Sequence, residues 1–309
     1  MSKNFALDLK NNFYSNGKLL LTGEYLVLDG ATALAMPTRY GQSLEVTSSE
    51  EKGIFWKSLD QNGAIWFEEV YRVEDCEAKV GGENKTSQSL SYILQQAKNL
   101  NPKFLENQMG LNVTTRLDFP QNWGLGSSST LINNIAQWAE IDAFTLLTTS
   151  FGGSGYDIAA AQNNTPILYK IEDGAHITET VAFNWNFINS LFFVHLNKKQ
   201  DSKEGITIYK NTSVSLVQRS IISAISHSLL VCESLLEFEK LLQKHEDLVS
   251  EIIQLPTVKQ RLFSDYSNTI KSLGAWGGDF VLAIGDEGDH DYFRKKGYNT
   301  IVPFSEMIL

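Results

Sequence analysis

Two glycines and three serines in the segment NWGLGSSSTLINNIAQW have the types and spacing that suit binding of a phosphate group. Gly124 and Gly126 permit close backbone approach and unusual φ values, and Ser127, Ser128 and Ser129 stand where a helix begins. Such a helix start presents unpaired N–H groups and a partial positive charge of about 0.5 to an anion. A serine hydroxyl there also suits Mg²⁺. A plainer alternative stays open, in which the serines only cap the helix.

The segment does not fit other glycine-rich motifs. A Walker loop ends in Gly-Lys-Ser/Thr, and no lysine stands there. A dinucleotide fingerprint follows a buried strand and ends in Gly or Ala, whereas Pro120 interrupts the approach and Ser129 occupies the last position. The GxSxG pattern of serine hydrolases is absent from both GLGSS and GGSGY.

A second glycine-rich segment, FGGSGYDIAAAQ, places Asp157 at the start of a predicted short helix. A carboxylate in this position can accept a proton from a substrate hydroxyl or orient it for attack on a γ-phosphate. Capping of the helix by Asp157 is the structural alternative.

A third such segment, SLGAWGGDFVLAIG, carries Gly274, Gly277 and Gly278 before an apolar strand, which suits either a ligand or a plain turn. Lys18 precedes another apolar run in NGKLLLTGEY. It is either a solvated charge at a sheet edge or a cation that neutralises phosphate.

The elements that must position these residues are strands followed by helices. Alternating β-branched and aromatic residues predict antiparallel strands in SLEVTS, GIFWKSL and AIWFEEVYRV, and a further strand in GLNVTTRLDF. FYSNGKLLLTGEYLVLDG predicts two short strands around a turn at Thr22–Gly23. Apolar spacing predicts helices over 87–99, from the serines to Ala139, within 205–254 and over 257–272. The pattern indicates an α+β protein with a soft boundary near residue 185.

Bulk composition excludes several classes of function. The 309 residues carry a net charge of −10, and no Lys/Arg run marks a nucleic-acid partner. Cys76 and Cys232 form no zinc or disulfide pattern and predict free thiols in a reducing compartment. No apolar signal core and no run near the ~20 residues of a membrane helix is evident. We therefore expect a cytoplasmic protein without a membrane partner.

Together, four segments resemble the motifs of the GHMP kinase superfamily, in the correct order and across nearly the whole chain. GKLLLTGEYLVLDGATALAMPT resembles its first motif, GLGSSS its nucleotide phosphate loop and LGAWGGDF its third motif. GSGYDIA is similar to the segment that carries the catalytic Asp in the mevalonate and phosphomevalonate kinases.

The resemblance implies a two-domain α+β fold with an active site between the domains. Residues 1–185 would form an N-terminal ATP-binding domain related to the second domain of ribosomal protein S5, and residues 186–309 a ferredoxin-like C-terminal domain. It also implies ATP and Mg²⁺ as cofactors and a small anionic metabolite as partner, and a homodimer is left open.

The resemblance assigns site residues by motif position. The residues that would bind ATP phosphates are Gly124, Leu125, Gly126, Ser127, Ser128 and Ser129, with Ser128 as the Mg²⁺ contact. Asp157 would be the catalytic base, and Lys18 would pair with it and hold transferring charge. The substrate side would be formed by Glu24, Tyr25, Gly155, Gly277 and Gly278.

GEY and GSGYDIAAA look more like phosphomevalonate kinases than mevalonate kinases. The chain departs from both, because the upstream Mg²⁺-binding Glu has only Glu140 and Asp142 as nearby counterparts, and because Trp276 and Asp279 replace small residues. The expected reaction is transfer of the ATP γ-phosphate to mevalonate or 5-phosphomevalonate. The alternatives are a kinase of another metabolite, a non-catalytic nucleotide or metabolite sensor, and the related decarboxylase. Cations available for a substrate phosphate are Arg39, Lys198, Lys199 and Lys203.

Overall fold

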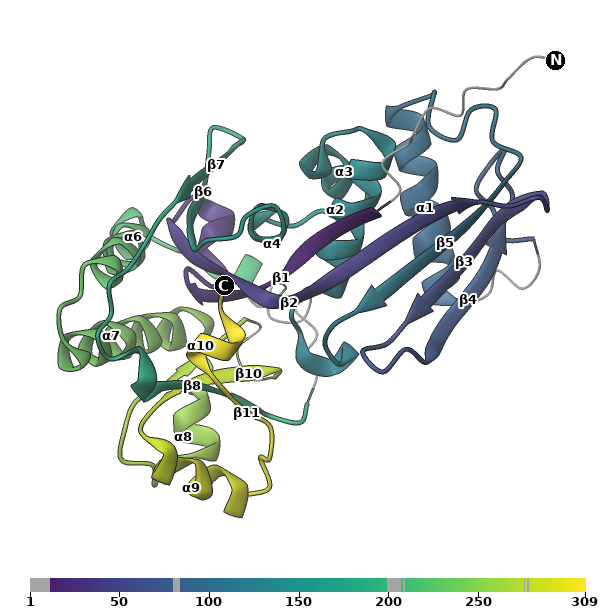
Figure 1. The fold of residues 1–309 in the computed structure, drawn as a ribbon. Helices are drawn as coiled ribbons and strands as arrows, with labels where there is room; N and C mark the ends of the chain where they lie inside the picture. Colours follow the sequence, from purple (N-terminus) through teal and green to yellow (C-terminus); the bar gives the residue numbers. More distant parts are fainter. Residues whose placement is uncertain (1–11, 80–83, 199–206, 208, 275, 277) are drawn as a thin grey trace. The chain divides into compact units, whose positions relative to one another are not determined.

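The computed structural model describes residues 12–79, 84–198, 207, 209–274, 276 and 278–309 (Figure 1). The chain forms two compact units, each assembled from separate stretches of sequence. Unit 1 comprises Met1–Ser15, Tyr40–Gln121 and Gly126–Ala161, and unit 2 comprises Asn16–Arg39, Asn122–Leu125 and Gln162–Leu309. The chain passes from unit 2 to unit 1 between Leu125 and Gly126, inside the glycine–serine segment. The boundary predicted near residue 185 separates the two domains of the resembled fold, which are not the same as these compact units. That boundary stays a prediction.

Unit 1 contains a sheet in which β5 lies between β3 and the second part of β2. Residues 42–48 of β2 pair antiparallel with β5, whereas β3 pairs parallel with β5 and antiparallel with β4. Buried and exposed residues alternate along much of β5, which indicates that one face is covered. The bounds are β2 Ala33–Ser48, β3 Gly53–Leu59, β4 Ile65–Tyr71 and β5 Gly110–Leu117.

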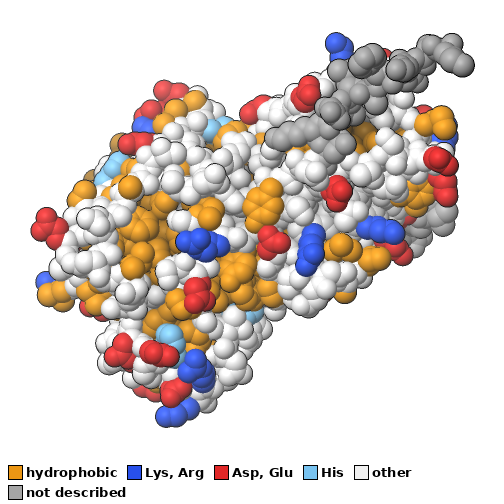
Figure 2. Space-filling view, in the orientation of Figure 1, with side chains coloured by type: hydrophobic (Ala, Val, Ile, Leu, Met, Phe, Trp, Pro, Cys, Tyr) orange, Lys and Arg blue, Asp and Glu red, His pale blue; other side chains and the backbone are white. Residues whose placement is uncertain are grey.

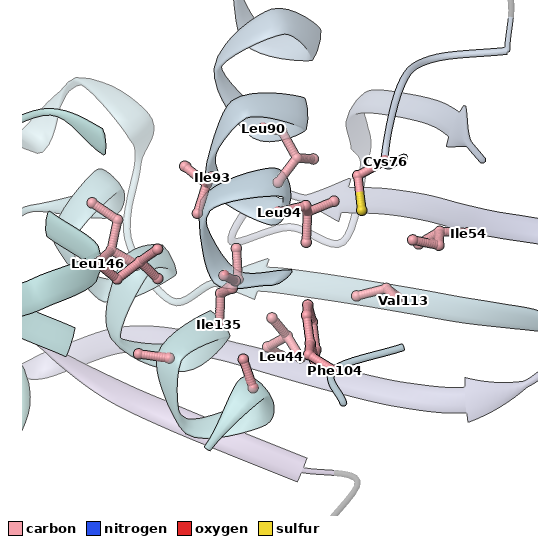
Figure 3. Close-up of a cluster of buried hydrophobic side chains, with 14 of the residues drawn as sticks. Leu44, Ile54, Cys76, Leu90, Ile93, Leu94, Phe104, Val113, Ile135 and Leu146 are labelled. Atoms are coloured by element: carbon pink, nitrogen blue, oxygen red, sulfur yellow. The ribbon is translucent and has the colours of Figure 1, made fainter. Parts of the chain in front are cut away.

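Helices supply the cover for this sheet, and their apolar residues form the core of unit 1. Figure 3 shows Leu90, Ile93 and Leu94 of one helix meeting strand residues such as Ile54 and Val113. The spacing of three and four residues brings these side chains to one helix face. Full burial of each such side chain contributes roughly 1.5–3 kcal/mol. The helices are α1 Lys85–Leu100, α2 Ser127–Ala139, α3 Ala143–Ser150 and α4 Tyr156–Ala161.

Unit 2 contains a four-stranded sheet in the order β11-β8-β10-β9, with all neighbours antiparallel. A second group of strands pairs the first part of β2 with β6, and β6 with β7. β1 pairs with β2. The bounds are β1 Asn12–Thr22, β6 Ile167–Glu172, β7 Ala175–Thr180, β8 Leu191–His195, β9 Ile270–Ser272, β10 Phe280–Ile284 and β11 Ile301–Pro303.

Two long helices of unit 2 begin at serine caps, which satisfy amide N–H groups that a helix start leaves unpaired. Ser215 forms a capping box with Gln218, and the Ser234 hydroxyl accepts from the Glu237 amide. The indole ring of Trp185 packs edge-on against Phe238 and Phe304. The helices are α6 Leu216–Leu230, α7 Leu235–Ile253, α8 Val258–Leu262, α9 His290–Lys295 and α10 Phe304–Met307.

The α+β class and most predicted elements are confirmed, but two predictions are wrong. After β1 the expected second strand is replaced by a 3-10 helix, Leu26–Asp29. Gly23 turns the chain with φ +91°, and a Cβ atom there would lie 2.6 Å from that of Ala33. The predicted helix over 257–272 ends as α8 at Leu262, because turn-forming residues follow and Ile270–Ser272 pairs with β10.

On the face drawn in Figure 2, Lys and Arg side chains are dispersed among acidic ones rather than gathered in one patch. Within the described residues, none of the helices has both the length and the apolar character needed to span a bilayer.

Candidate functional site

The glycine–serine segment forms a tight turn into α2. Gly124 and Gly126 have φ values of +65° and +90°, a region that side-chain-bearing residues rarely adopt. Gly126 is the N-cap of α2, and it is accompanied by no side-chain capping bond. The helix therefore begins at Ser127, as predicted. The alternative in which a serine caps the helix is wrong, because the N-cap residue is Gly126.

The three serines differ in what their hydroxyl groups can reach. The Ser129 hydroxyl is buried and donates to the Gly126 carbonyl at 2.8 Å, so it holds the turn itself. Ser127 is half-buried and Ser128 is exposed. The first turn of a 13-residue helix thus presents backbone N–H groups and an accessible hydroxyl to solvent, an arrangement that suits a phosphate oxygen and a hard cation.

Asp157 lies in the same unit as these serines. It is the second residue of α4, and α4 packs against α2. The preceding Gly155 is buried with φ +82°. The Asp157 carboxylate is half-buried and accepts from the Ile158 amide at 3.1 Å. α2 and α4 thus position the serine turn and this carboxylate from two packed helices of unit 1.

In unit 2, Lys18 forms hydrogen bonds with the first two residues of the segment GLGSSS. Its ammonium group donates to the Gly124 carbonyl at 2.8 Å. Its backbone N–H donates to the Leu125 carbonyl at 2.9 Å. Leu125 is wholly buried, which anchors the segment where the chain leaves unit 2. Lys18 and Gly124, 106 residues apart along the chain, are therefore neighbours.

The third glycine segment also reaches Gly124. A Cβ atom at position 124 would overlap the carboxyl group of Asp279, with even the farther oxygen at 2.6 Å. Asp279 itself has φ +53°, and Trp276 has φ +59°. Gly278 is buried, and Gly277 lies outside the described residues. Two residues that replace expected small ones thus adopt conformations that favour glycine. One of them, Asp279, places its carboxyl group against Gly124 of the glycine–serine segment.

Glu24 and Tyr25, predicted on the substrate side, are both buried. Glu24 accepts from the Lys271 ammonium at 2.5 Å, and Tyr25 stacks on Tyr209 with ring centroids 5.7 Å apart. Burial raises the pKa of Glu24 to about 7, although Lys271 acts in the opposite direction. The substrate role of both residues stays a prediction.

Two of the four predicted auxiliary cations, Arg39 and Lys198, lie within the described residues. Arg39 is exposed and donates to the Ser305 carbonyl at 2.9 Å. Lys198 is exposed, and its carbonyl accepts from the Asp279 amide at 2.7 Å. Lys199 and Lys203 lie outside the described residues.

Comparison with solved structures gives the fold. The chain is similar to the mevalonate kinase of Methanococcus jannaschii, at 14% identity and a TM-score of 0.67 over 94% of this chain and 96% of that one. It is similar to the Streptococcus pneumoniae phosphomevalonate kinase, solved with phosphomevalonate and AMPPNP, at 16% identity and a TM-score of 0.66 over 92% and 95%. A third match is the Lactococcus lactis galactokinase complexed with galactose, at 14% identity and a TM-score of 0.65 over 93% and 89%. The chain has the GHMP kinase fold.

This fold assignment rests on the comparison of structures, because no family model and no curated protein match the chain by sequence. The predicted GHMP fold is therefore confirmed. At these identities the acceptor is not given by the fold, since the matched structures include a mevalonate kinase, a phosphomevalonate kinase and a galactokinase.

The residues present fit a magnesium ion that arrives on nucleotide phosphates. Mg²⁺ commonly takes one or two protein oxygens and completes its shell with phosphate and water. The exposed Ser128 hydroxyl at the start of α2 can supply one of these oxygens. Among the described residues, no cluster of three or more His, Cys, Asp or Glu side chains forms a metal cage.

Neither of the two acids considered as a substitute for the Mg²⁺-binding Glu lies near Ser128. Glu140 caps the opposite end of α2, which is about 18 Å away at 1.5 Å per residue. Asp142 caps α3, where its carboxylate accepts from the Thr145 amide at 2.7 Å.

Sequence reasoning missed the groups that hold Glu24: Lys271, His245 and Glu246. Lys271 directly precedes the third glycine segment, but a lysine in a three-residue strand looks like an edge charge. Only the packing of α7 and β9 identifies these residues as its buried partners.

Proposed function

We propose that this protein is an ATP-dependent small-molecule kinase that transfers the γ-phosphoryl group to a hydroxyl or phosphate of a small anionic metabolite. Mevalonate and 5-phosphomevalonate are the acceptors to test first. The observation that supports the proposal most strongly is the turn into α2, where Gly126 is the N-cap without a side-chain bond and the Lys18 ammonium is fixed on Gly124.

The turn is proposed to bind the nucleotide phosphates. Backbone N–H groups from Gly126 to Ser128 would donate to phosphate oxygens, with the dipole of α2 favouring negative charge. Magnesium, bound through Ser128 and the nucleotide, would neutralise charge that develops on the phosphate oxygens. Lys18 would contribute a fixed positive charge beside the same loop.

Asp157 is proposed to accept the proton of the acceptor or to orient it. Its place in the first turn of α4, where one carboxylate oxygen accepts from the Ile158 amide, suits a group that accepts a proton from an acceptor hydroxyl. The predicted pairing of Asp157 with Lys18, and the acceptor-side roles of Gly155, Gly278, Glu24 and Tyr25, remain parts of this proposal.

The test is a coupled ADP-release assay with ATP and Mg²⁺, in which mevalonate and 5-phosphomevalonate are compared side by side with galactose and a heptose phosphate. The proposal predicts acceptor-dependent ADP release, with mass spectrometry showing the phosphorylated product. CO₂ release would identify the decarboxylase instead. Absence of acceptor-dependent turnover across this panel, with protein shown to be folded, would refute the acceptor class.

A nucleotide sensor on the same fold is the second candidate, and the Asp279 carboxylate against Gly124 favours it. A carboxylate beside the segment proposed to bind phosphate would oppose that binding to the extent that the Lys18 ammonium, on the same glycine, does not offset its charge. The sensor predicts saturable ATP binding by calorimetry without ADP release with any acceptor. Replacement Asp279→Asn would then strengthen ATP binding without producing turnover.

A further inference from the structure

Four titratable side chains meet in the interior of unit 2. Glu24 follows β1, His245 and Glu246 are neighbours on α7, and Lys271 lies in β9. Each of them is at most 1% exposed. Titratable groups buried this completely are rare unless they are paired, so their charges must be balanced locally.

Lys271 lies at the centre of these four residues, which we call the Lys271 cluster. Its ammonium lies 2.5 Å from Oε1 of Glu24 and 3.2 Å from Oε1 of Glu246, and it also donates to the Ser272 carbonyl. The other oxygen of Glu246 accepts from the Ser272 hydroxyl at 2.7 Å. The cluster thereby joins the Gly23–Tyr25 turn to α7 and to the strand before the third glycine segment.

The cluster has one cation for two carboxyl groups. His245 cannot supply a second cation, because its Nε2 accepts a hydrogen bond from the Gly23 amide at 3.0 Å and so carries no proton. With both carboxyl groups ionised, the interior would hold one unbalanced negative charge, which is strongly unfavourable at low dielectric.

The geometry also contains a place for the missing proton. Oε2 of Glu24 lies 3.2 Å from Nε2 of His245, where two acceptor atoms face each other. Within the described residues, this oxygen is buried without a hydrogen-bond donor, whereas Oε1 of Glu246 has the Lys271 ammonium 3.2 Å away. A proton on one of the two carboxyl groups removes both the charge imbalance and part of this mismatch.

We propose that the Lys271 cluster holds one proton on its two carboxyl groups at weakly acidic pH and loses it above neutrality, and that Lys271 is a positioning residue for Tyr25. The positioning role of Lys271 rests on the proposed function, which places Tyr25 on the acceptor side. A neutral cluster beside Tyr25 is compatible with an anionic acceptor, whereas loss of the proton leaves a negative charge that repels it.

The burial of these side chains and the position of Glu246 beside a surface pocket both support the proposed proton. Burial raises the pKa of Glu24 to about 7 and raises the pKa of Glu246, while it lowers the pKa of His245 well below 6.5. Glu246 also lines a surface pocket of about 260 Å³, which gives protons a route to the cluster. Lys259 is the other charged group lining that pocket, and its ammonium donates to the Asn268 carbonyl at 2.8 Å. Tyr25, directly after Glu24, is a further titratable group beside the cluster.

Infrared spectroscopy of the whole protein tests the proton directly, because a protonated carboxyl group absorbs apart from a carboxylate. At about pH 6, below the pKa of about 7, the wild type should show one buried carboxylic-acid band. Glu246→Gln should remove it, because Glu24 then pairs with Lys271 as a carboxylate. Glu172→Gln, in an exposed pair with Lys170, should leave the band unchanged. A wild type without this band would overturn the inference whether or not the protein proves to be a kinase.

Acceptor kinetics test the positioning role. The acceptor KM of the wild type should rise several-fold as pH increases through about 7, while that of Glu246→Gln should stay flat. Lys271→Met should raise the acceptor KM, and Lys271→Arg should bring the KM part of the way back to the wild-type value. In the infrared measurement, Lys271→Met should show two carboxylic acids. If Lys271→Met does not fold, Lys271→Met/Glu24→Gln, which leaves one carboxylic acid, replaces it in the infrared measurement. Identical KM profiles for wild type and Glu246→Gln would overturn the positioning role.

Discussion

The Lys18 ammonium donates to the Gly124 carbonyl at 2.8 Å, although 106 residues separate the two along the chain. The Lys18 amide donates to the next carbonyl, that of Leu125, at 2.9 Å. This double attachment fixes a positive charge beside a turn whose helix start is free of a side-chain cap.

Lys18→Met should reduce turnover by about 10²–10³-fold, because a fixed cation aimed at transferring charge is worth several kcal/mol in a site that excludes water. Lys18→Arg should recover only a part of this rate, since the planar guanidinium has a different shape and hydration. Steady-state kinetics check both. The matched control is Lys170→Met, which removes a surface lysine of the same unit and should leave kcat unchanged. A Lys18→Met enzyme with wild-type kcat would exclude the assigned role.

Asp157→Asn should lower turnover by about 10²–10⁴-fold, the usual contribution of a general base. Nucleotide affinity, measured by calorimetry, should stay within several-fold because the carboxylate acts on the acceptor. Asp142→Asn serves as control: it changes an exposed cap of α3 and should cost about 1 kcal/mol or less of stability with normal turnover. Wild-type turnover in Asp157→Asn would refute the role of this residue.

Ser128→Ala should raise the concentrations of Mg²⁺ and ATP needed for half-maximal activity. It should also weaken Mn²⁺–nucleotide binding followed by electron paramagnetic resonance. Ser129→Ala should behave differently, because that hydroxyl is bound to Gly126 inside the turn. Its loss should cost about 1 kcal/mol of unfolding free energy, with an unchanged Mg²⁺ titration. If Ser128→Ala also left both metal measurements unchanged, the magnesium contact would have to be reassigned.

Gly124→Ala should be destabilising for two reasons that can be separated. The left-handed φ of +65° costs about 1–2 kcal/mol for a residue with a Cβ atom, and that atom also overlaps the Asp279 carboxyl group. Gly63→Ala carries only the first cost, since φ is +82° and nothing lies within 4 Å of its Cβ position. Denaturant unfolding should show a larger loss for Gly124→Ala and partial recovery in Gly124→Ala/Asp279→Gly. Equal losses for the two alanine variants would contradict the clash.

The pH dependence of stability should change in opposite directions when two members of the Lys271 cluster are replaced. Glu24 has a folded-state pKa raised to about 7, so the folded state binds more protons there than the unfolded state. Its contribution is present below the ordinary pKa near 4.5 and is lost as pH rises through about 7. His245 has a lowered pKa, so its contribution is present above about 6.5 and is lost as pH falls.

Between about pH 5 and 6.5 these two effects oppose each other, which predicts a weak slope in the wild type. His245→Gln keeps an acceptor for the Gly23 amide and should become more stable as pH falls. Glu24→Gln should become less stable over the same interval, by up to about 1.4 kcal/mol per pH unit. Urea unfolding at several pH values gives these slopes. Parallel curves for the three proteins would show that neither group titrates as described.

The sequence alone determined the local features of this protein. The Gly-rich turn into α2, the helical face of α1 and the antiparallel strands β3 and β4 follow from residue types at short spacing. Backbone conformation and amphipathic period depend on neighbours within a few residues, so a reader of the sequence can recover them. The same residues, through their resemblance to four motifs, led to the GHMP fold.

Tertiary structure decided which distant residues meet. Asp279 against Gly124, and Glu24 with Lys271, join segments whose contacts depend on the packing of several elements at once. Ile270–Ser272 became a strand because β10 offers it hydrogen bonds, although its local pattern indicates a helix. A buried lysine and an exposed one look alike in sequence, because the free energy that distinguishes them arises only when the surrounding chain removes water.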